Sequence, residues 1–434
     1  MNGPDGILLR GARPVTPGQT RPGEPCDVWV RGGQIEGLGA AGTLGAPEGA
    51  RVVEAEGCLL LPGLFDMNVH LREPGREDKE DMASASAAAL NGGITGLLAM
   101  PNTDPPVDSG GMVQSVRDLA AAKSRVPVFP AGCITHGREG AELAAIGDMA
   151  EKGALLLTDD PNPVENPQVL RRAMEYARDF GLILASHATT PALVRGGAMN
   201  EGPTSFRLGL PGLPAIAEEI AIARDIALAR LTGCPLHIQH VSTARGMDVI
   251  RKAKEEGLAV TCEVTPHHLI FDETAVGDYD TRFKMDPPLR LPEDVEALLD
   301  ALLDGTADVI TSDHAPHSEF EKETDFASAP FGVSALDTAL AALFHHLVKP
   351  GRVPWGILVE RYSAAPRRLL GLPSVEIRAG AQANLVVFDP EASTHVTRDF
   401  LCSQGLNNPF LGRTLDGAVR MVLLGPQVAV GMAG

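Results

Sequence analysis

Residues 235–264, PLHIQHVSTARGMDVIRKAKEEGLAVTCEV, contain two short apolar runs separated by a stretch with helical periodicity. The runs PLHIQHV and LAVTCEV have the length of buried strands, and ARGMDVIRKAKEEG between them has the composition of a helix. A strand, a helix and a second strand in this order form the unit from which parallel sheets are built. This stretch therefore predicts an α/β fold.

The same alternation extends over the middle of the chain. Besides the two runs above, the apolar runs are GLFDMNVH (63–70), TGLLAMPN (95–102), VPVFPAG (126–132), ALLLTDD (154–160), LILASH (182–187) and ADVITSDH (307–314). Eight strand-helix units fit a (β/α)8 barrel of the TIM type. A doubly wound open sheet is the alternative on this pattern, although the first turn lacks the glycine-rich phosphate fingerprint of many such sheets.

The two ends of the chain differ from the middle. Residues 1–60 and 373–434 are rich in glycine and proline and contain strand-like pieces such as DVWVRGGQIEGLG and VEIRAGAQANLVVFDP. We therefore predict one small β-sandwich domain formed by both termini, 1–60 and 373–434, around a barrel at 61–372.

Composition excludes several classes of partner. The 434 residues carry a formal net charge of −19, which argues against nucleic acid or an anionic membrane as partner but allows a small anionic substrate. The sequence starts without a signal peptide pattern, and no apolar run approaches membrane-spanning length. The six cysteines are scattered without a C-x-x-C pair, which predicts reduced thiols and a cytoplasmic protein.

Ionisable residues follow five of the eight predicted strands. In a barrel these positions meet at the C-terminal mouth, where active sites lie. A single histidine or aspartate at a strand end is more often a cap, but their coincidence indicates a site for a divalent transition metal. The residues are His70, Asp159, Asp160, His187, His240 and Asp313.

The remaining histidines are weaker candidates. His237 lies three residues before His240, so strand alternation directs the two side chains to opposite faces. His267 and His268 follow the seventh strand and could line the mouth. We expect no direct role for His136, His345, His346 or His395.

Several motifs occur together in one order: HLREPG, MPNTDPP, HVST, EVTPHHL, DPPLR, SDHAPH and APFG. With them the chain resembles the dihydroorotases of the bacterial class I type, in the amidohydrolase superfamily, from about residue 60 to 372. GAQANLVVFDP and NNPFLGRTLDG extend the resemblance almost to the end. The resemblance implies a zinc-dependent barrel enzyme that reversibly cyclises N-carbamoyl-L-aspartate to (S)-dihydroorotate in pyrimidine (UMP) biosynthesis.

The resemblance also implies roles for individual residues. One zinc ion would be held by an H-x-H pair, of which His70 is present, by a bridging Asp160 and by Asp313; the other would be held by Asp160, His187 and His240. Zinc lowers the pKa of bound water, and Asp313 would take the proton and return it to the leaving nitrogen. The residues expected to contact substrate are Arg72, Asn102, Asp286, His317, Phe331 and Gly332.

Four positions depart from the family pattern. Asn68 replaces the first histidine of H-x-H, Asp286 replaces an asparagine, Pro161 follows the bridging aspartate, and SHATT replaces HCED around His187. Because a carboxamide oxygen is a poorer zinc ligand than imidazole, we expect one firmly held zinc and a second that is weak or absent. A carboxylate at position 286 predicts a raised KM for the anionic dihydroorotate.

Two other functions stay open on the sequence. The first is a weakly active or inactive homologue that assembles with aspartate carbamoyltransferase. The second is another cyclic-amide hydrolase, such as a hydantoinase or allantoinase, although those commonly bridge their metals with a carboxylated lysine where this chain has Asp160. The resemblance further implies a homo-oligomer.

Overall fold

Eight parallel strands form a closed barrel in the computed structural model, which describes residues 6–430. They are β6 (Leu64–Val69), β7 (Ile94–Ala99), β8 (Val128–Pro130), β9 (Leu156–Leu157), β10 (Ile183–Ser186), β13 (Leu236–Ile238), β14 (Val260–Val264) and β15 (Val309–Ile310). Parallel bridges from Gly132 to Leu157 and from Val69 to His314 join the two arcs of the ring. The barrel prediction is confirmed, and the open-sheet alternative is wrong.

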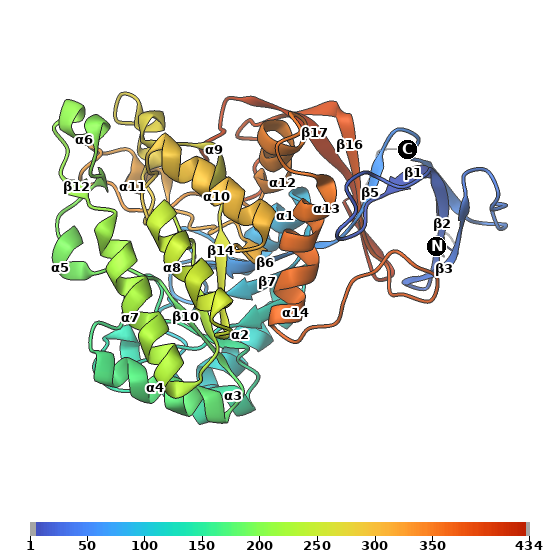
Figure 1. Cartoon of the computed structure of the whole chain (residues 1–434). Helices are drawn as coiled ribbons and strands as arrows, with labels where there is room; N and C mark the ends of the chain where they lie inside the picture. The colour runs from blue at the N-terminus through green and yellow to red at the C-terminus, as the bar shows by residue number, and fades with distance from the viewer. Residues whose placement is uncertain (1–5, 431–434) are drawn as a thin grey trace.

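Helices surround the strands, as Figure 1 shows. They are α1 (Met82–Asn91), α2 (Gly110–Lys123), α3 (Ile146–Glu151), α4 (Pro167–Asp179), α7 (Ile216–Thr232), α8 (Ala244–Glu255), α10 (Pro292–Asp304), α12 (Ala339–Leu343), α13 (Trp355–Val359) and α14 (Ala365–Leu369). Side-chain caps fix where some of them begin: Asp81 accepts from the backbone of Ser84 at α1, and Thr243 accepts from Gly246 at α8. The helical stretch expected between the runs PLHIQHV and LAVTCEV forms α8.

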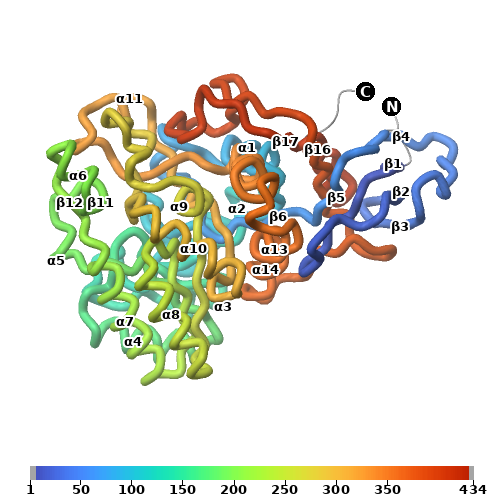
Figure 2. The backbone as a smooth tube through the Cα atoms, turned by 45° about the horizontal axis from the view of Figure 1, so that its top comes forward, coloured from blue at the N-terminus to red at the C-terminus, as the bar shows by residue number. Residues whose placement is uncertain are grey.

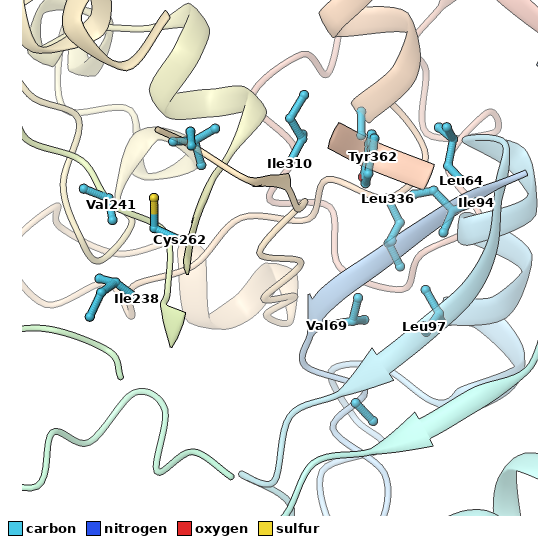
Figure 3. Close-up of a cluster of buried hydrophobic side chains, with 14 of the residues drawn as sticks. Leu64, Val69, Ile94, Leu97, Ile238, Val241, Cys262, Ile310, Leu336 and Tyr362 are labelled. Carbon is cyan, nitrogen blue, oxygen red and sulfur yellow. The ribbon is translucent and has the colours of Figure 1, made fainter. Parts of the chain in front are cut away.

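The barrel core is made by the alternate side chains of the strands and by the inner faces of the helices. Figure 3 shows Leu64 and Val69 of β6, Ile94 and Leu97 of β7, and Tyr362, all within one buried cluster. All five are fully buried. Strands covered on both sides are apolar at nearly every position.

A second sheet lies beside the barrel and takes strands from both ends of the chain (Figure 1). Its order is β18-β17-β16-β5-β1-β2-β3, with β4 paired to β1. The strands are β1 (Ile7–Pro14), β2 (Cys26–Arg31), β3 (Gln34–Ala40), β4 (Arg51–Glu54), β5 (Leu59–Pro62), β16 (Asn384–His395), β17 (Thr414–Leu424) and β18 (Gln427–Val430). It has a core of its own that includes Leu9, Val28 and Leu385. The prediction of a small β-domain from both termini is confirmed.

Short elements occupy the long loops that follow the strands (Figure 2). They are η1 (His136–Arg138), α5 (Pro191–Val194), β11 (Met199–Asn200), α6 (Pro203–Leu208), β12 (Gly212–Leu213), α9 (Pro266–Ile270), η2 (Glu273–Val276), η3 (Thr281–Phe283) and α11 (Glu319–Lys322), and two π-helical turns, η4 (Phe344–Val348) and η5 (Glu360–Ala364), interrupt the last helices. Across residues 6–430, no helix has both the length and the apolar character needed to cross a membrane.

Candidate active site

A cavity of about 210 Å³ opens at the C-terminal ends of the barrel strands. Nine of the twelve residues to which the family resemblance gives a place in the site line it: His70, Arg72, Asn102, Asp160, Asp286, Asp313, His317, Phe331 and Gly332. His187 and His240 line a smaller cavity that shares Asp286 with the first. Asn68, the twelfth, is fully buried and contacts Asp160. The fold thus brings all twelve into one region.

Three buried side chains form a compact group of possible metal ligands: Asp160, His187 and His240. His187 Nδ1 is 3.0 Å from His240 Nε2 and 3.8 Å from Asp160 Oδ1, and His240 Nε2 is 3.6 Å from Asp160 Oδ2. Two ligands about 2.1 Å from a tetrahedral zinc ion would be about 3.4 Å apart. The donor atoms therefore already have the spacing and the chemical type that one zinc ion requires.

The same group is electrostatically coupled. Burial disfavours the Asp160 carboxylate, but its hydrogen bond with His240 and the charges of His70 and His187 outweigh this and lower its pKa. Burial likewise opposes the charged form of His240, but the contact with Asp160 and the nearby Asp313 raise the pKa of His240 to about 10. A carboxylate stays ionised here, as a metal ligand must be.

The second predicted metal site, at His70 and Asp313, has fewer ligands. His70 Nε2 is 3.5 Å from Asp313 Oδ1, and His70 Nδ1 is 2.9 Å from Asn102 Oδ1. Because an amide oxygen only accepts hydrogen bonds, Nδ1 carries a proton and Nε2 faces Asp313. His70 is therefore oriented as a ligand would be.

Asn68 occupies the place of the missing histidine without replacing its chemistry. Its amide Nδ2 donates to Asp160 Oδ2 at 3.3 Å and to Glu263 Oε1 at 3.1 Å. Its Oδ1 is buried and has no hydrogen-bond partner among the described residues. The amide thus satisfies an oxygen of Asp160 that a bridging carboxylate would otherwise offer to a metal.

The substrate side of the cavity is built around Arg72. Its Nε donates to the carbonyl of Pro316 at 3.2 Å, and burial lowers the pKa of Arg72 to about 10, so the guanidinium remains charged at neutral pH. His317 Nε2 donates to the carbonyl of Phe331 at 2.8 Å. Burial, with the positive charges of Arg72 and Lys79, lowers the pKa of His317 to about 3, so His317 is neutral.

Asp286, the carboxylate that stands in place of an asparagine, lies beside His187. Its Oδ2 is 3.6 Å from His187 Nε2, whereas the Lys284 ammonium donates to the carbonyls of Phe326 and Ala327. Burial raises the pKa of Asp286, but the contact with His187 outweighs burial and lowers it overall, so Asp286 is ionised. This carboxylate faces a metal-ligand histidine.

None of the weaker histidine candidates lines the substrate cavity. His237 is in the barrel interior, 3.1 Å from Glu263 Oε2, and His268 Nε2 donates to the carbonyl of Pro287 at 2.9 Å. His267 is buried, and neither ring nitrogen has a hydrogen-bond partner within residues 6–430. His136 contacts Asp108 and His345 contacts Asp416, both away from the cavity.

Three residues that hold Asp160 were not predicted from the sequence, and Asp159, which was predicted for the metal site, does not line the cavity. Gln239 Nε2 donates to Asp160 Oδ2 at 3.0 Å, and Arg138 donates to the Asp160 carbonyl at 2.8 Å. Glu263 reaches Asp160 through Asn68. Strand alternation from His237 would have placed Gln239 on the interior face. Asp159 instead accepts from the backbone of Ile134 and Thr135 and secures a loop.

Comparisons with known proteins agree with this geometry. The family described as "Dihydro-orotase-like" matches residues 57–246. The dihydroorotase of Geobacter metallireducens is 42% identical over 422 residues, covering 97% of this chain and 99% of that protein. The dihydroorotase of Mycobacterium leprae is 43% identical and covers 96% of each chain.

Solved structures with the same fold have more distant sequences. The L-hydantoinase of Arthrobacter aurescens superposes with a TM-score of 0.85 at 23% identity, covering 99% of this chain and 96% of that one. The dihydropyrimidinase of Brevibacillus agri gives a TM-score of 0.82 at 23% identity, covering 98% and 95%. At this identity the likeness establishes the fold.

Proposed function

Since this chain belongs to the dihydroorotase family of cyclic-amide hydrolases, we propose that it interconverts N-carbamoyl-L-aspartate and (S)-dihydroorotate with one firmly held zinc ion. The observation that supports this most directly is the Asp160, His187 and His240 group, whose donor atoms are 3.0–3.8 Å apart beside a cavity that contains Arg72 and Asp313. Metal ligands, a base and a cation for an anionic substrate then lie within one cavity.

Asp160, His187 and His240 would hold the zinc ion. When bound, zinc polarises the scissile carbonyl and lowers the pKa of water. Asp313 lines the same cavity and takes the proton of the attacking water, then returns it to the leaving ring nitrogen. The Arg72 guanidinium binds the substrate carboxylate, and Phe331 and Gly332 form the wall that covers the ring.

The Asn68 contacts support a single strong metal site. A metal bridging from Asp160 toward His70 would compete with the hydrogen bond from Asn68 Nδ2 to Asp160 Oδ2. The remaining ligands would be His70, Asp313 and at best the Asn68 carboxamide oxygen, which binds zinc weakly. We infer that a second zinc binds much more weakly than the first.

The test is hydrolysis of dihydroorotate by the purified, zinc-reconstituted protein alone. We expect clear turnover, with about one zinc per chain retained after dialysis. A folded, zinc-containing sample without turnover would contradict the proposal and favour a role as an assembly partner. A metal-loaded structure occupied only on the His70 side would contradict the assignment of the strong site.

Asp313→Asn provides the sharper version of this test. An amide cannot accept the proton, so we expect kcat to fall by about 10²–10⁴-fold. Because Asp313 is not among the three ligands of the strong site, the variant should still retain about one zinc per chain. A variant with more than a tenth of wild-type turnover would remove Asp313 from the proposed mechanism.

Three related predictions depend on other evidence. All six cysteines are unpaired and lie within the described residues, which supports the proposed cytoplasmic location. The formation of a homo-oligomer and an association with aspartate carbamoyltransferase remain predictions.

The hydantoinase alternative finds no support at the bridging position, where Asp160 stands instead of a lysine.

A further inference from the structure

Asp286 faces the rear of a metal-ligand histidine as well as the substrate cavity. The His187 ring has two nitrogens: Nδ1 lies near Asp160 and His240, and Nε2 lies 3.6 Å from Asp286 Oδ2. The Asp286 side chain is 34% exposed, because it lines both cavities. One side chain can therefore interact with the ligand set and with the substrate.

We propose that Asp286 is a positioning residue that orients His187 and strengthens its bond to zinc, in exchange for weaker binding of the anionic substrate. This inference rests on the proposed function, because it concerns the same metal site. Histidine ligands commonly donate the N–H of their second nitrogen to a carboxylate, which fixes the ring and increases its basicity.

His70, the remaining histidine of the H-x-H pair, also has a hydrogen-bond partner on its second ring nitrogen. His70 presents Nε2 toward the centre and donates Nδ1–H to Asn102 Oδ1 at 2.9 Å. Asn102 and Asp286 both line the substrate cavity. Each of these ligands is thus backed by a cavity residue, but only His187 is backed by a carboxylate.

The backbone around Asp286 is held from several directions. His268 Nε2 donates to the carbonyl of Pro287 at 2.9 Å, and Thr265 Oγ1 is 2.8 Å from His268 Nδ1. Arg290, which is 4% exposed, donates to Ser242 Oγ and to the carbonyl of Leu213. These contacts hold the backbone of the segment that carries Asp286.

The separation of 3.6 Å is slightly longer than a hydrogen bond. A movement of a few tenths of an ångström would close it. Zinc on Nδ1 withdraws electron density from the ring and makes Nε2–H a stronger donor, so the contact should shorten in the loaded protein. A neutral asparagine at this position could accept the same hydrogen bond, but without a charge.

The test compares zinc affinity with substrate affinity in the same variants. Zn²⁺ is titrated against a chromophoric chelator for wild type, Asp286→Asn and Asp286→Glu, and KM for dihydroorotate is measured for each. We expect Asp286→Asn to raise the Kd for zinc by about 10–100-fold and to lower KM. Asp286→Glu should recover part of the lost zinc affinity, because it restores the carboxylate.

Asp248→Asn is the matched control for the change in net charge. Asp248 pairs with Arg251 on the surface of α8, and its side chain is 52% exposed. This variant should bind zinc as wild type does. Thermal unfolding of the metal-free variants shows whether each is folded before titration.

Two outcomes would overturn the inference. One is an Asp286→Asn protein whose zinc Kd is within twofold of wild type; the other is an Asp248→Asn control that loses as much affinity. Failure of the proposed function is distinguishable, because it appears as a wild-type protein that binds zinc and does not hydrolyse dihydroorotate.

Discussion

Three site residues adopt backbone conformations that residues other than glycine rarely adopt. The φ angles of Arg72, His240 and Asp313 are +61°, +33° and +47°. Residues held in this region cost of order 1–3 kcal/mol each and persist only where the surroundings determine them. Strand periodicity could not place these side chains, because each lies just past a strand where the regular alternation has ended.

Position 68 shows how one substitution changes the number of strong metal sites. Asn68→His would supply an imidazole beside His70, Asp160 and Asp313, and so complete a four-ligand site. We expect the zinc content after dialysis to rise from about one to about two per chain, measured by elemental analysis. The activity of the variant should not fall, since the Asp160, His187 and His240 group is unchanged.

A matched comparison is Asn68→Ala, which removes the hydrogen bonds to Asp160 and Glu263 without adding a ligand. Its zinc content should stay at about one per chain. An Asn68→His protein that still retains one zinc would show that the amide is not what limits the second site.

At the scale of single elements, an ion pair joins helix α11 to the loop that follows the first barrel strand, β6. Glu321 Oε1 is 2.6 Å from Lys79 Nζ, and the Lys79 side chain is 8% exposed. The Lys322 ammonium of the same helix donates to the carbonyls of Thr281 and Pro330. These contacts hold the loop that carries Phe331 and Gly332 against the cavity.

The Lys79–Glu321 pair predicts a specific dependence of stability on pH. Burial opposes the charged Glu321, but Lys79 and His317 outweigh it and lower the pKa from 4.5 to about 2. The folded-state pKa lies below the unfolded value, so the stabilisation is complete above about pH 4.5 and is lost as pH falls toward 2. We expect Glu321→Gln to cost about 1–2 kcal/mol at pH 7.

The measurement is thermal unfolding of metal-free wild type and Glu321→Gln from pH 7 to the lowest pH at which both are folded. The difference in Tm should be constant above pH 5 and should shrink below it. Glu256→Gln, which breaks a pair with Arg230 in which both side chains are more than half exposed, should change Tm less. A difference that persists unchanged into acid would assign the effect to packing.

At this scale the strands and helices of the barrel follow directly from local sequence, whereas closure of the ring had to be weighed against an open sheet. Apolar runs of four to eight residues locate buried strands, and eight alternations with helices make an α/β fold nearly unavoidable. Closure depends on contacts between residues far apart in sequence, such as the bridge from Val69 to His314. The position of Asp286 beside His187 is equally non-local, so a substrate role was the only one its motif could suggest.

For the whole molecule, the barrel and the small sheet are joined through continuous chain and direct packing. β5 ends at Pro62 and β6 begins at Leu64, so a strand of the sheet leads into the first barrel strand through Gly63. The Gly63 N–H donates to the carbonyl of Asn384 at 3.0 Å. We infer that the two parts unfold together, because separating them exposes apolar surface on both.

The N-terminal segment provides a test of that coupling. Gly356 of α13 packs against the loop that follows β1, and the Gly18 N–H donates to the Gly356 carbonyl at 3.3 Å. A Cβ added at Gly356 would lie 2.0 Å from the backbone oxygen of Gln19, which cannot rotate away as a side chain could. We expect Gly356→Ala to destabilise the protein by about 1–3 kcal/mol, which is about 1–3 °C in Tm for a chain of this length.

Gly111→Ala is the control, because a Cβ at that position in α2 would have no neighbour within 4 Å. Alanine is the better helix former, so this variant should be neutral or slightly more stable. A single, lowered transition in Gly356→Ala, seen alike by calorimetry and by loss of zinc, would show that the sheet and the barrel unfold as one unit. Two separated transitions would show instead that the barrel keeps its metal site after the N-terminal segment detaches, and would contradict the coupling.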